Sequence, residues 1–294
     1  MRTIIVVVRG ADPTRWGMGE DMKLKDKVAI ITGGASGIGS ATCLKLAGEK
    51  VKAIGVVDQT DNVVAVCAEA NSQLGGEILI PFRGDVVDSS FREGVFNEME
   101  SRFGPVSLCV PAAGITRDRL CVKVHQNNGW TSPSIYSETD FRRVIDVDLI
   151  SPIYWAMRTV GSVAVDRVKR GLKQWNPEES VQGAIILIGS ISSAGNRGQI
   201  SYATAKAGLE GAQGTLSKEA IYYGVRCAII HPGFTDTPMV RALGDRMIQE
   251  QVLPNTQLHR LIRPDEIAGA IVFMLKNSAV SGTLWADAGW HPRA

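Results

Sequence analysis

The sequence predicts an α/β fold, a doubly wound parallel sheet of seven strands that forms a single domain. Two observations predict this fold. Short apolar runs rich in β-branched residues alternate with longer amphipathic stretches, which is the rhythm of repeated strand–helix–strand units. The 294 residues, 45% of them hydrophobic and 21% charged, are enough to bury one sizeable core.

Seven apolar runs are expected to be the strands. They are VAIITGG from residue 28, VKAIGVVD from 51, EILIPFRGD from 77, VSLCVPAAG from 106, GAIILIGS from 183, VRCAIIHPG from 225 and TLWADAG from 283. Each run is almost continuously apolar, as strands are when helices cover both faces of a parallel sheet. Helices are expected between the runs, among them 138–170 and stretches that begin near 203 and 264.

The first residues of the chain show neither a helical nor a strand period. We therefore expect residues 1–23 to be a poorly ordered tail before a folded domain at 24–294. The apolar stretch Ile4–Val8 is too short for the core of a signal peptide and too short to span a bilayer.

Charge and cysteine usage point to small-molecule ligands. A net charge of +2 without a dominant basic block gives no reason to expect a nucleic acid or a membrane as partner. Five cysteines, an odd number without CxxC pairing, indicate reduced thiols and a cytoplasmic protein. The four histidines lack metal-ligand spacing, so we expect no catalytic metal.

A glycine-rich loop follows the first strand, at the carboxyl edge where doubly wound sheets bind ligands. In TGGASGIG, the residues Gly33, Gly37 and Gly39 let the backbone turn tightly, and Ser36 and Ile38 complete the loop. This arrangement would bring the free N–H groups of a helix N-terminus against a pyrophosphate. An ordinary strand-to-helix turn is the alternative, and the order of strand, glycines and helix favours the pyrophosphate site.

The second strand ends in Asp58, about twenty residues after the loop. A carboxylate at this place can accept both hydroxyls of an adenosine ribose and would repel a 2′-phosphate. The sequence therefore predicts NAD as the preferred cofactor.

The fifth strand is followed by Ser190, Tyr202 and Lys206. Tyr202 and Lys206 stand four residues apart at a helix start and share one face, so the ammonium is expected to lower the pKa of the phenol. Such a phenol can exchange a proton with a substrate oxygen, which Ser190 can hold by a hydrogen bond. An incidental Tyr–Lys pair on a surface helix is the alternative, and the glycine loop argues against it.

These motifs together resemble the short-chain dehydrogenase/reductase family from Lys25 to Trp290. The resemblance implies a Rossmann fold in which Ser190, Tyr202 and Lys206 are catalytic and the glycine loop binds the cofactor. It also implies further cofactor contacts for Asp85 and Val86 at the adenine, for Ala113 and Gly114 of the PAAG motif, and for Pro232, Gly233, Thr235 and Thr237 at the nicotinamide.

Within the family, GNRGQISYATAKAGLEG and AAGITRD are most similar to the 3-oxoacyl-acyl-carrier-protein reductases. Steroid, polyol and 3-hydroxyacyl dehydrogenases carry similar phrases. The resemblance also implies a homotetramer, and it places a substrate lid near 238–263, whose apolar residues suggest a partly apolar substrate.

Three departures from the family pattern stand out. The family's NNAG is PAAG here, so the hydrogen bonds between strand ends must be rebuilt. The family's active-site asparagine is Asp148, which can still take part in a water-mediated proton relay to Lys206. The spacing between Ser190 and Tyr202 is one residue shorter than usual, which leaves Ser192 as an alternative serine.

Two insertions lengthen the chain. Residues 117–137, with Trp130 as the residue to test, either roof the substrate pocket or form a surface excursion. Residues 161–182 carry Arg167, Lys169, Arg170 and Lys173, which either dock an acidic carrier protein or form a solvated helix end, the latter being favoured.

The expected function is hydride transfer between NAD and an alcohol or ketone, with a 3-oxoacyl thioester as one candidate substrate. A free steroid, polyol or sugar is the alternative substrate class. An NAD-binding sensor or structural subunit without catalysis is the alternative of another kind, and the intact Ser190, Tyr202 and Lys206 set argues against it.

Overall fold

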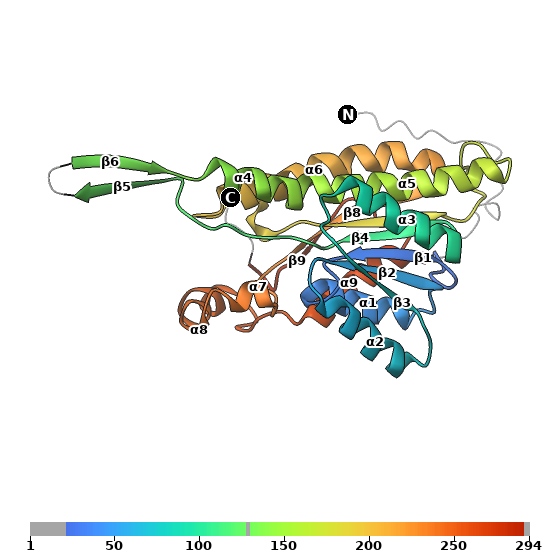
Figure 1. The fold of residues 1–294 in the computed structure, drawn as a ribbon, viewed down its shortest axis with the longest axis horizontal. Helices are drawn as coiled ribbons and strands as arrows, with labels where there is room; N and C mark the ends of the chain where they lie inside the picture. The colour runs from blue at the N-terminus through green and yellow to red at the C-terminus, as the bar shows by residue number, and fades with distance from the viewer. Residues whose placement is uncertain (1–21, 128–129, 291–294) are drawn as a thin grey trace, which may run out of the picture.

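One parallel seven-stranded sheet runs through the computed structural model, which describes residues 22–127 and 130–290 (Figure 1). The strand order is β3-β2-β1-β4-β7-β8-β9. The strands are β1 (Val28–Thr32), β2 (Ala53–Asp58), β3 (Leu79–Arg83), β4 (Val106–Pro111), β7 (Gly183–Ile188), β8 (Val225–Pro232) and β9 (Thr283–Ala286). The chain order reverses between β1 and β4, so a crevice opens there at the carboxyl edge of the sheet. The predicted fold class is confirmed.

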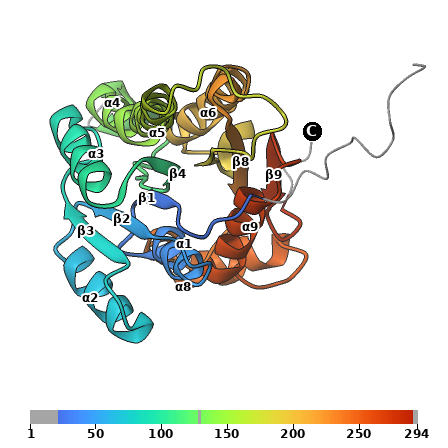
Figure 2. The ribbon, with the colours of Figure 1, turned by 90° about the vertical axis from the view of Figure 1, so that its right-hand side faces the viewer.

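Helices cover both faces of the sheet (Figure 2). One face carries α1 (Gly37–Ala47), α2 (Asn62–Leu74) and α9 (Pro264–Lys276), and the other carries α3 (Ser89–Phe103), α4 (Glu138–Ile145), α5 (Ser151–Lys169) and α6 (Ile200–Glu219). Short helical segments follow β7, α6 and β8: η2 (Ile191–Ala194), η3 (Ala220–Tyr223), α7 (Pro238–Arg241), α8 (Asp245–Met247), η4 (Ile248–Val252) and η5 (Leu253–Asn255).

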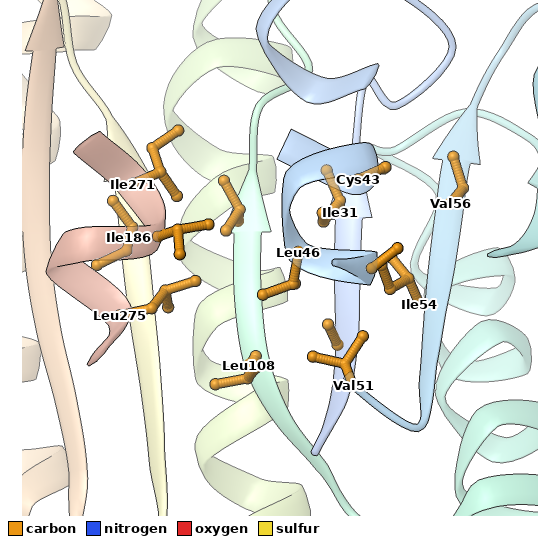
Figure 3. Packing of buried hydrophobic residues seen from close by; sticks show 14 of the residues in the cluster. Ile31, Cys43, Leu46, Val51, Ile54, Val56, Leu108, Ile186, Ile271 and Leu275 are labelled. Atoms are coloured by element: carbon orange, nitrogen blue, oxygen red, sulfur yellow. The ribbon is translucent and has the colours of Figure 1, made fainter. Parts of the chain in front are cut away.

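Strands inside the sheet send alternate side chains into two separate cores. Ile31 and Ile186 pack under α1 and α9, as Figure 3 shows, whereas their neighbours Ile30 and Ile185 pack under the helices of the opposite face. All four side chains are fully buried. Burial on both faces is why the strands read as continuous apolar runs in the sequence.

The predicted helix at 138–170 contains an irregular turn. Between α4 and α5 lies the π-helical turn η1 (Asp146–Ile150), which holds Asp148. A π-turn adds one residue to the helical repeat and often marks a functional site. Here it lies at the carboxyl edge of the sheet, beside the end of β4.

The first insertion forms a two-stranded antiparallel hairpin, β5 (Val122–Asn127) and β6 (Trp130–Ile135), which extends away from the body of the protein (Figure 1). Val124 and Ile135 are 63% and 67% exposed. The hairpin strands line neither of the two hollows described below, so they are a surface excursion rather than a roof. The side chain of Trp130 lies outside the described residues.

The cysteines differ sharply in exposure. Cys121, at the base of the hairpin, is exposed, whereas the other four are buried. Burial raises the pKa of the Cys67 thiol to about 11 and the pKa values of Cys109 and Cys227 to about 12.

Arg167 is the buried member of the basic cluster in the second insertion, whereas Lys169, Arg170 and Lys173 are exposed. Arg167 is fully buried and binds Glu179 with two hydrogen bonds of 2.7 and 3.2 Å. Arg170 pairs with Asp166 at 2.9 Å. The expectation of a solvated helix end or a carrier-docking patch is therefore wrong for Arg167, because its ion pair folds the following loop back onto α5.

Two contacts fasten the C-terminal end of α9 and the turn that follows it. Met22 is buried and its N–H donates to the carbonyl of Lys276, so the folded domain includes this residue, two positions before the expected start at residue 24. The buried guanidinium of Arg226, on β8, donates to the carbonyls of Met274, Leu275 and Val280 at the end of the helix. Within the described ranges, no helix combines the length and the apolar character needed to cross a membrane.

Candidate active site

A cleft of about 350 Å³ opens at the carboxyl edge of the sheet, where β1 and β4 diverge. A side pocket of about 130 Å³ adjoins it. The predicted residues that line the cleft are Gly33, Ser36, Gly37, Ile38, Asp58, Asp85, Val86, Ala113, Gly114, Tyr202, Lys206 and Thr237. Those that line the side pocket are Ile38, Ser190, Ser192, Tyr202, Pro232, Gly233, Thr235 and Thr237.

The glycine loop leaves no room for side chains at two positions. A Cβ on Gly33 would lie 2.8 Å from the main chain of Ala113, and the φ of Gly33 is +66°. A Cβ on Gly39 would lie only 2.1 Å from the carbonyl oxygen of Gly33. The backbones of β1, of the residues after β4 and of the start of α1 are therefore in direct contact at this loop.

Asp58 closes the cleft at the end of β2. Its carboxylate accepts from the N–H of Ala35 at 3.1 Å and from the N–H and hydroxyl of Thr60 at 3.0 and 2.9 Å. Arg83 stands opposite Asp58 in the strand register, and its guanidinium pairs with Asp61 at 2.7 Å. A negative charge is thus fixed between the glycine loop and the next turn.

Asp85 and Val86 form the neighbouring wall. Arg143 on α4 donates to Asp85 at 2.8 Å. The carbonyl of Val86 accepts from Ser151 and from the indole of Trp155, at 3.1 and 3.0 Å. These bonds fasten the loop after β3 to α5 and hold it at the edge of the cleft.

The strand ends that carry PAAG are tied through Thr32. Its hydroxyl accepts from the N–H of Ala113 at 3.1 Å, and its carbonyl accepts from the N–H of Ala112 at the same distance. The end of β1 thus supplies main-chain and hydroxyl acceptors to the amides of the motif.

Asp148 lies behind the cleft and is completely buried. One carboxylate oxygen accepts from the N–H of Ile115 at 2.9 Å, and the other lies 3.4 Å from Nζ of Lys206. A Cβ on Gly114 would lie 2.9 Å from the second oxygen, so this glycine makes room for the carboxylate. The π-turn thus holds a buried ion pair beneath the cleft.

Lys206 is 4% exposed and connects Asp148 with Tyr202. Its Nζ donates to the carbonyl of Ile188 at 3.1 Å and lies 5.4 Å from the centre of the Tyr202 ring. Tyr202 lines both hollows, and Ser190 lines the side pocket next to it. The structure therefore brings the four predicted catalytic residues together.

Burial and the charge on Lys206 shift the pKa values of Tyr202 and Asp148 in opposite directions. Burial raises the pKa of Tyr202 above its usual value; the charge on Lys206 and a hydrogen bond with Ser190 lower it, and the charge on Asp148 raises it. Burial also raises the pKa of Asp148, while the lysine lowers it. The expectation that Lys206 lowers the pKa of the phenol holds for the direction of its effect, but burial outweighs it here.

The predicted nicotinamide segment follows β8. A Cβ on Gly233 would lie 2.6 Å from the carbonyl oxygen of Asp287, so the segment packs against the end of β9 at backbone distance. The hydroxyl of Thr235 donates to the carbonyl of Gly233 at 3.0 Å, and Thr237 accepts from the N–H of Val240 at the start of α7. This segment forms one wall of the side pocket.

The side pocket has one polar and one apolar wall. Gln199 donates to Asp118 at 2.8 Å and accepts from Ser192 at 2.8 Å and from Asn196 at 2.9 Å. Ser192 is thus engaged away from Tyr202, which favours Ser190 as the serine beside the phenol. The apolar wall is made by Ile191, Phe234, Met239, Val240 and Leu243.

Sequence reasoning missed the polar wall and the role of Arg143. Asp118 comes from the first insertion and Gln199 from the loop before α6, and only the fold brings them together. The one signal in the sequence was that Asp118 follows the predicted strand at 106 and Gln199 follows the predicted strand at 183. Arg143 offered none, because helix surfaces commonly carry arginines.

The residues that line the cleft fit a dinucleotide. At Gly33 and Gly39 there is no room for a side chain, so a pyrophosphate could approach the backbone closely. The carboxylate of Asp58, held by the N–H of Ala35, lies at the other end of the cleft. Pockets of this size with a few fixed polar groups are typical of small-molecule and cofactor sites.

Comparisons with known proteins show which family the chain belongs to. A family model described as short chain dehydrogenase matches residues 27–247. The chain is similar to 3-oxoacyl-acyl-carrier-protein reductase FabG of Escherichia coli (strain K12), with 29% identity over 274 residues that cover 92% of this chain and 99% of that protein. The reductase of the same name from Thermotoga maritima is 32% identical over 259 residues, covering 88% and 94%.

A solved structure supports the fold. The crystal structure of a short-chain type dehydrogenase/reductase from Mycobacterium marinum matches with a TM-score of 0.75 and 22% identity, covering 91% of this chain and 96% of that one. With three quarters of the sequence matched by the family model, the chain belongs to the short-chain dehydrogenase family of oxidoreductases.

Proposed function

We propose that the protein is an NAD-dependent oxidoreductase that transfers a hydride between the nicotinamide ring and the carbon of an alcohol or ketone. The observation that carries the proposal is the position of Tyr202, which lines both the cleft and the side pocket beside the buried ammonium of Lys206. A carbonyl that gains a hydride must also gain a proton on oxygen, and a phenol at this junction can deliver it.

Four residues share the work at the substrate oxygen. Ser190 holds the oxygen by a hydrogen bond, and Tyr202 gives or takes the proton. Lys206 favours the phenolate, and Asp148 fixes the lysine and, with a water, completes the proton relay. When bound, the nicotinamide supplies or accepts the hydride.

The remaining predicted residues hold the cofactor. The glycine loop, with Ser36 and Ile38, binds the pyrophosphate through its N–H groups. Asp85 and Val86 contact the adenine, and Ala113 and Gly114 form the floor. The nicotinamide end is held by Pro232, Gly233, Thr235 and Thr237.

The preference for NAD rests on Asp58. Its carboxylate is fixed by three hydrogen bonds at the edge of the cleft, where it can accept the ribose hydroxyls and would repel a phosphate. Arg83, the basic residue across the register, is already paired with Asp61.

The proposed substrate is a 3-oxoacyl thioester. The names of the two reductases above support it, and the apolar wall of Phe234, Met239 and Leu243 suits an acyl chain. A free steroid, polyol or sugar remains the alternative, for which the polar wall around Gln199 provides hydrogen-bonding groups.

The test is oxidation of NADH and NADPH with acetoacetyl-CoA, a short diketone, a ketosteroid and a ketose, run beside Tyr202→Phe. We expect turnover with NADH and acetoacetyl-CoA, and its loss in Tyr202→Phe while NADH binding is kept. Retained turnover in that variant would contradict the role of the phenol. Tight NADH binding without turnover of any substrate would instead favour a sensor.

We also propose that the protein is a homo-oligomer, a tetramer by its family resemblance. One side of α5 carries apolar side chains that are 41–69% exposed: Tyr154, Met157, Val165 and Val168. Their helical spacing places them on one face, and apolar faces of this kind mark protein interfaces. Light scattering that shows a monomer would contradict this.

A further inference from the structure

The imidazole of His231 lies directly behind Ser190. His231 is on β8 and is 0% exposed. Its Nδ1 lies 3.1 Å from the amide nitrogen of Ser190, which donates to it, and 2.9 Å from the carbonyl oxygen of the same residue. A Cβ on Gly189 would lie 2.5 Å from Nδ1, so this glycine makes room for the ring.

Three other side chains surround the ring. Trp285, its neighbour across the strand register, stacks on it with 4.3 Å between ring centres. The hydroxyl of Ser193 lies 3.4 Å from Nδ1. On the far side, a carboxylate oxygen of Glu210, from α6, lies 3.6 Å from Nε2.

Glu210 favours one arrangement of the proton on the ring. A carboxylate near Nε2 favours a proton on that nitrogen, and Nδ1 then has a lone pair free to accept the amide of Ser190. In the other tautomer Nδ1 would donate to the carbonyl of Ser190 instead. In both forms the imidazole is bonded to the main chain of this serine.

The conformation of the Ser190 main chain determines where its hydroxyl points. Its backbone is extended, with φ −167° and ψ 154°, and its hydroxyl accepts from the N–H of Ser192 at 3.1 Å. A shift of the peptide at Ser190 would turn the hydroxyl away from the oxygen that it has to hold beside Tyr202. Supporting groups of this kind keep a site in its productive geometry.

We propose that His231 is a positioning residue for Ser190. This inference rests on the proposed reaction. It assigns His231 no contact with substrate or cofactor. Loss of the ring nitrogen should therefore lower kcat and leave the affinity for NADH unchanged.

The test compares three substitutions of His231. His231→Phe keeps an aromatic ring against Trp285 and removes both nitrogens. His231→Asn places a polar atom where Nδ1 lies, and His231→Gln places one near Nε2. With NADH and acetoacetyl-CoA we expect kcat to fall by up to about 100-fold in the Phe and Gln variants, and the Asn variant to recover most of it. KM and the Kd for NADH should stay close to the wild-type values.

Hydrogen exchange gives a second readout that needs no turnover. The amide of Ser190 should exchange faster in His231→Phe than in the wild-type protein, and His231→Asn should restore its protection. His125→Phe, the same substitution on the exposed hairpin, is the matched control and should change neither kcat nor this exchange.

The outcomes separate this inference from the proposed function. If Tyr202→Phe abolishes turnover while His231→Phe keeps wild-type kcat and amide protection, the inference is wrong. Equal losses of kcat and protection in the Phe and Asn variants would also overturn it, because they would indicate a purely structural role. If the wild-type protein does not turn over acetoacetyl-CoA, the proposed substrate fails, and the exchange experiment alone decides whether His231 holds Ser190.

Discussion

Replacing Gly39 by alanine should disable the cofactor cradle. The new Cβ would lie 2.1 Å from the carbonyl oxygen of Gly33, whereas real Cβ atoms essentially never come closer than 3.0 Å. The loop and α1 must therefore separate by about 0.9 Å, the difference between these two distances. Gly33 is itself backed by the main chain of Ala113, so the loop has little space into which to move.

The magnitude follows from this displacement. Overpacking of this kind costs about 1–3 kcal/mol, and the higher helix propensity of alanine returns at most about 1 kcal/mol. We expect a net loss of about 0–3 kcal/mol in the free energy of unfolding. The peptide groups that should bind the pyrophosphate move by almost 1 Å, and a misplacement of this size commonly costs about 100-fold, here in the Kd for NADH.

Fluorescence titration with NADH and urea denaturation measure the two effects. Gly94→Ala is the matched control, because this glycine lies on an exposed turn of α3 and its Cβ would meet nothing within 4 Å. The control should gain about 0.5–1 kcal/mol of stability and bind NADH normally. A Gly39→Ala protein that binds NADH as well as the wild-type protein would refute the role given to the loop.

Three further outcomes are expected. Asp58→Arg should shift the ratio of kcat/KM for NADH and NADPH by about tenfold or more toward NADPH. The substitution removes a charge that repels the 2′-phosphate and adds one that attracts it, which together contribute over about 1.4 kcal/mol. An unchanged ratio would refute the role of Asp58 in selecting NAD. Asp148→Asn should move the rising limb of the pH profile for alcohol oxidation to lower pH, because the charge on Asp148 raises the pKa of Tyr202; a limb that moves to higher pH would contradict this. Arg226→Met should lower the free energy of unfolding by at least about 3 kcal/mol in urea denaturation, because hydrogen bonds from a charged group contribute about 1.5–3 kcal/mol each. A loss below about 1 kcal/mol would show that the carbonyls of Met274, Leu275 and Val280 find other donors.

Most of the fold followed from hydrophobic pattern alone. The seven runs predicted as strands, from residue 28 to residue 283, are the seven strands of the sheet. The hairpin at Val122–Ile135 was not predicted, although Asn128–Gly129 between two strand-like runs is a typical turn signal. Val122, Val124 and Ile135 are exposed, so the usual link between an apolar residue and burial fails there.

Some residues of the site could be predicted from the sequence and others could not. Residues such as Tyr202 and Lys206 were found because their spacing and their place after a strand carry the signal. The ion pair between Arg167 and Glu179 could not be found, because a charged residue on a helix normally indicates exposure. The position of His231 behind Ser190 needed the register of β7 against β8, which no local pattern contains.

The unequal exposure of the cysteines makes the protein ready for site-directed labelling. Maleimides attack thiolates, and burial both shields the other four sulfurs and keeps those of Cys67, Cys109 and Cys227 protonated near neutral pH. Cys121 is exposed and lies three residues from Asp118, which lines the side pocket. A fluorophore attached there would stand at the base of the hairpin, and a change in its emission when substrate is added would show that binding alters the surroundings of this segment.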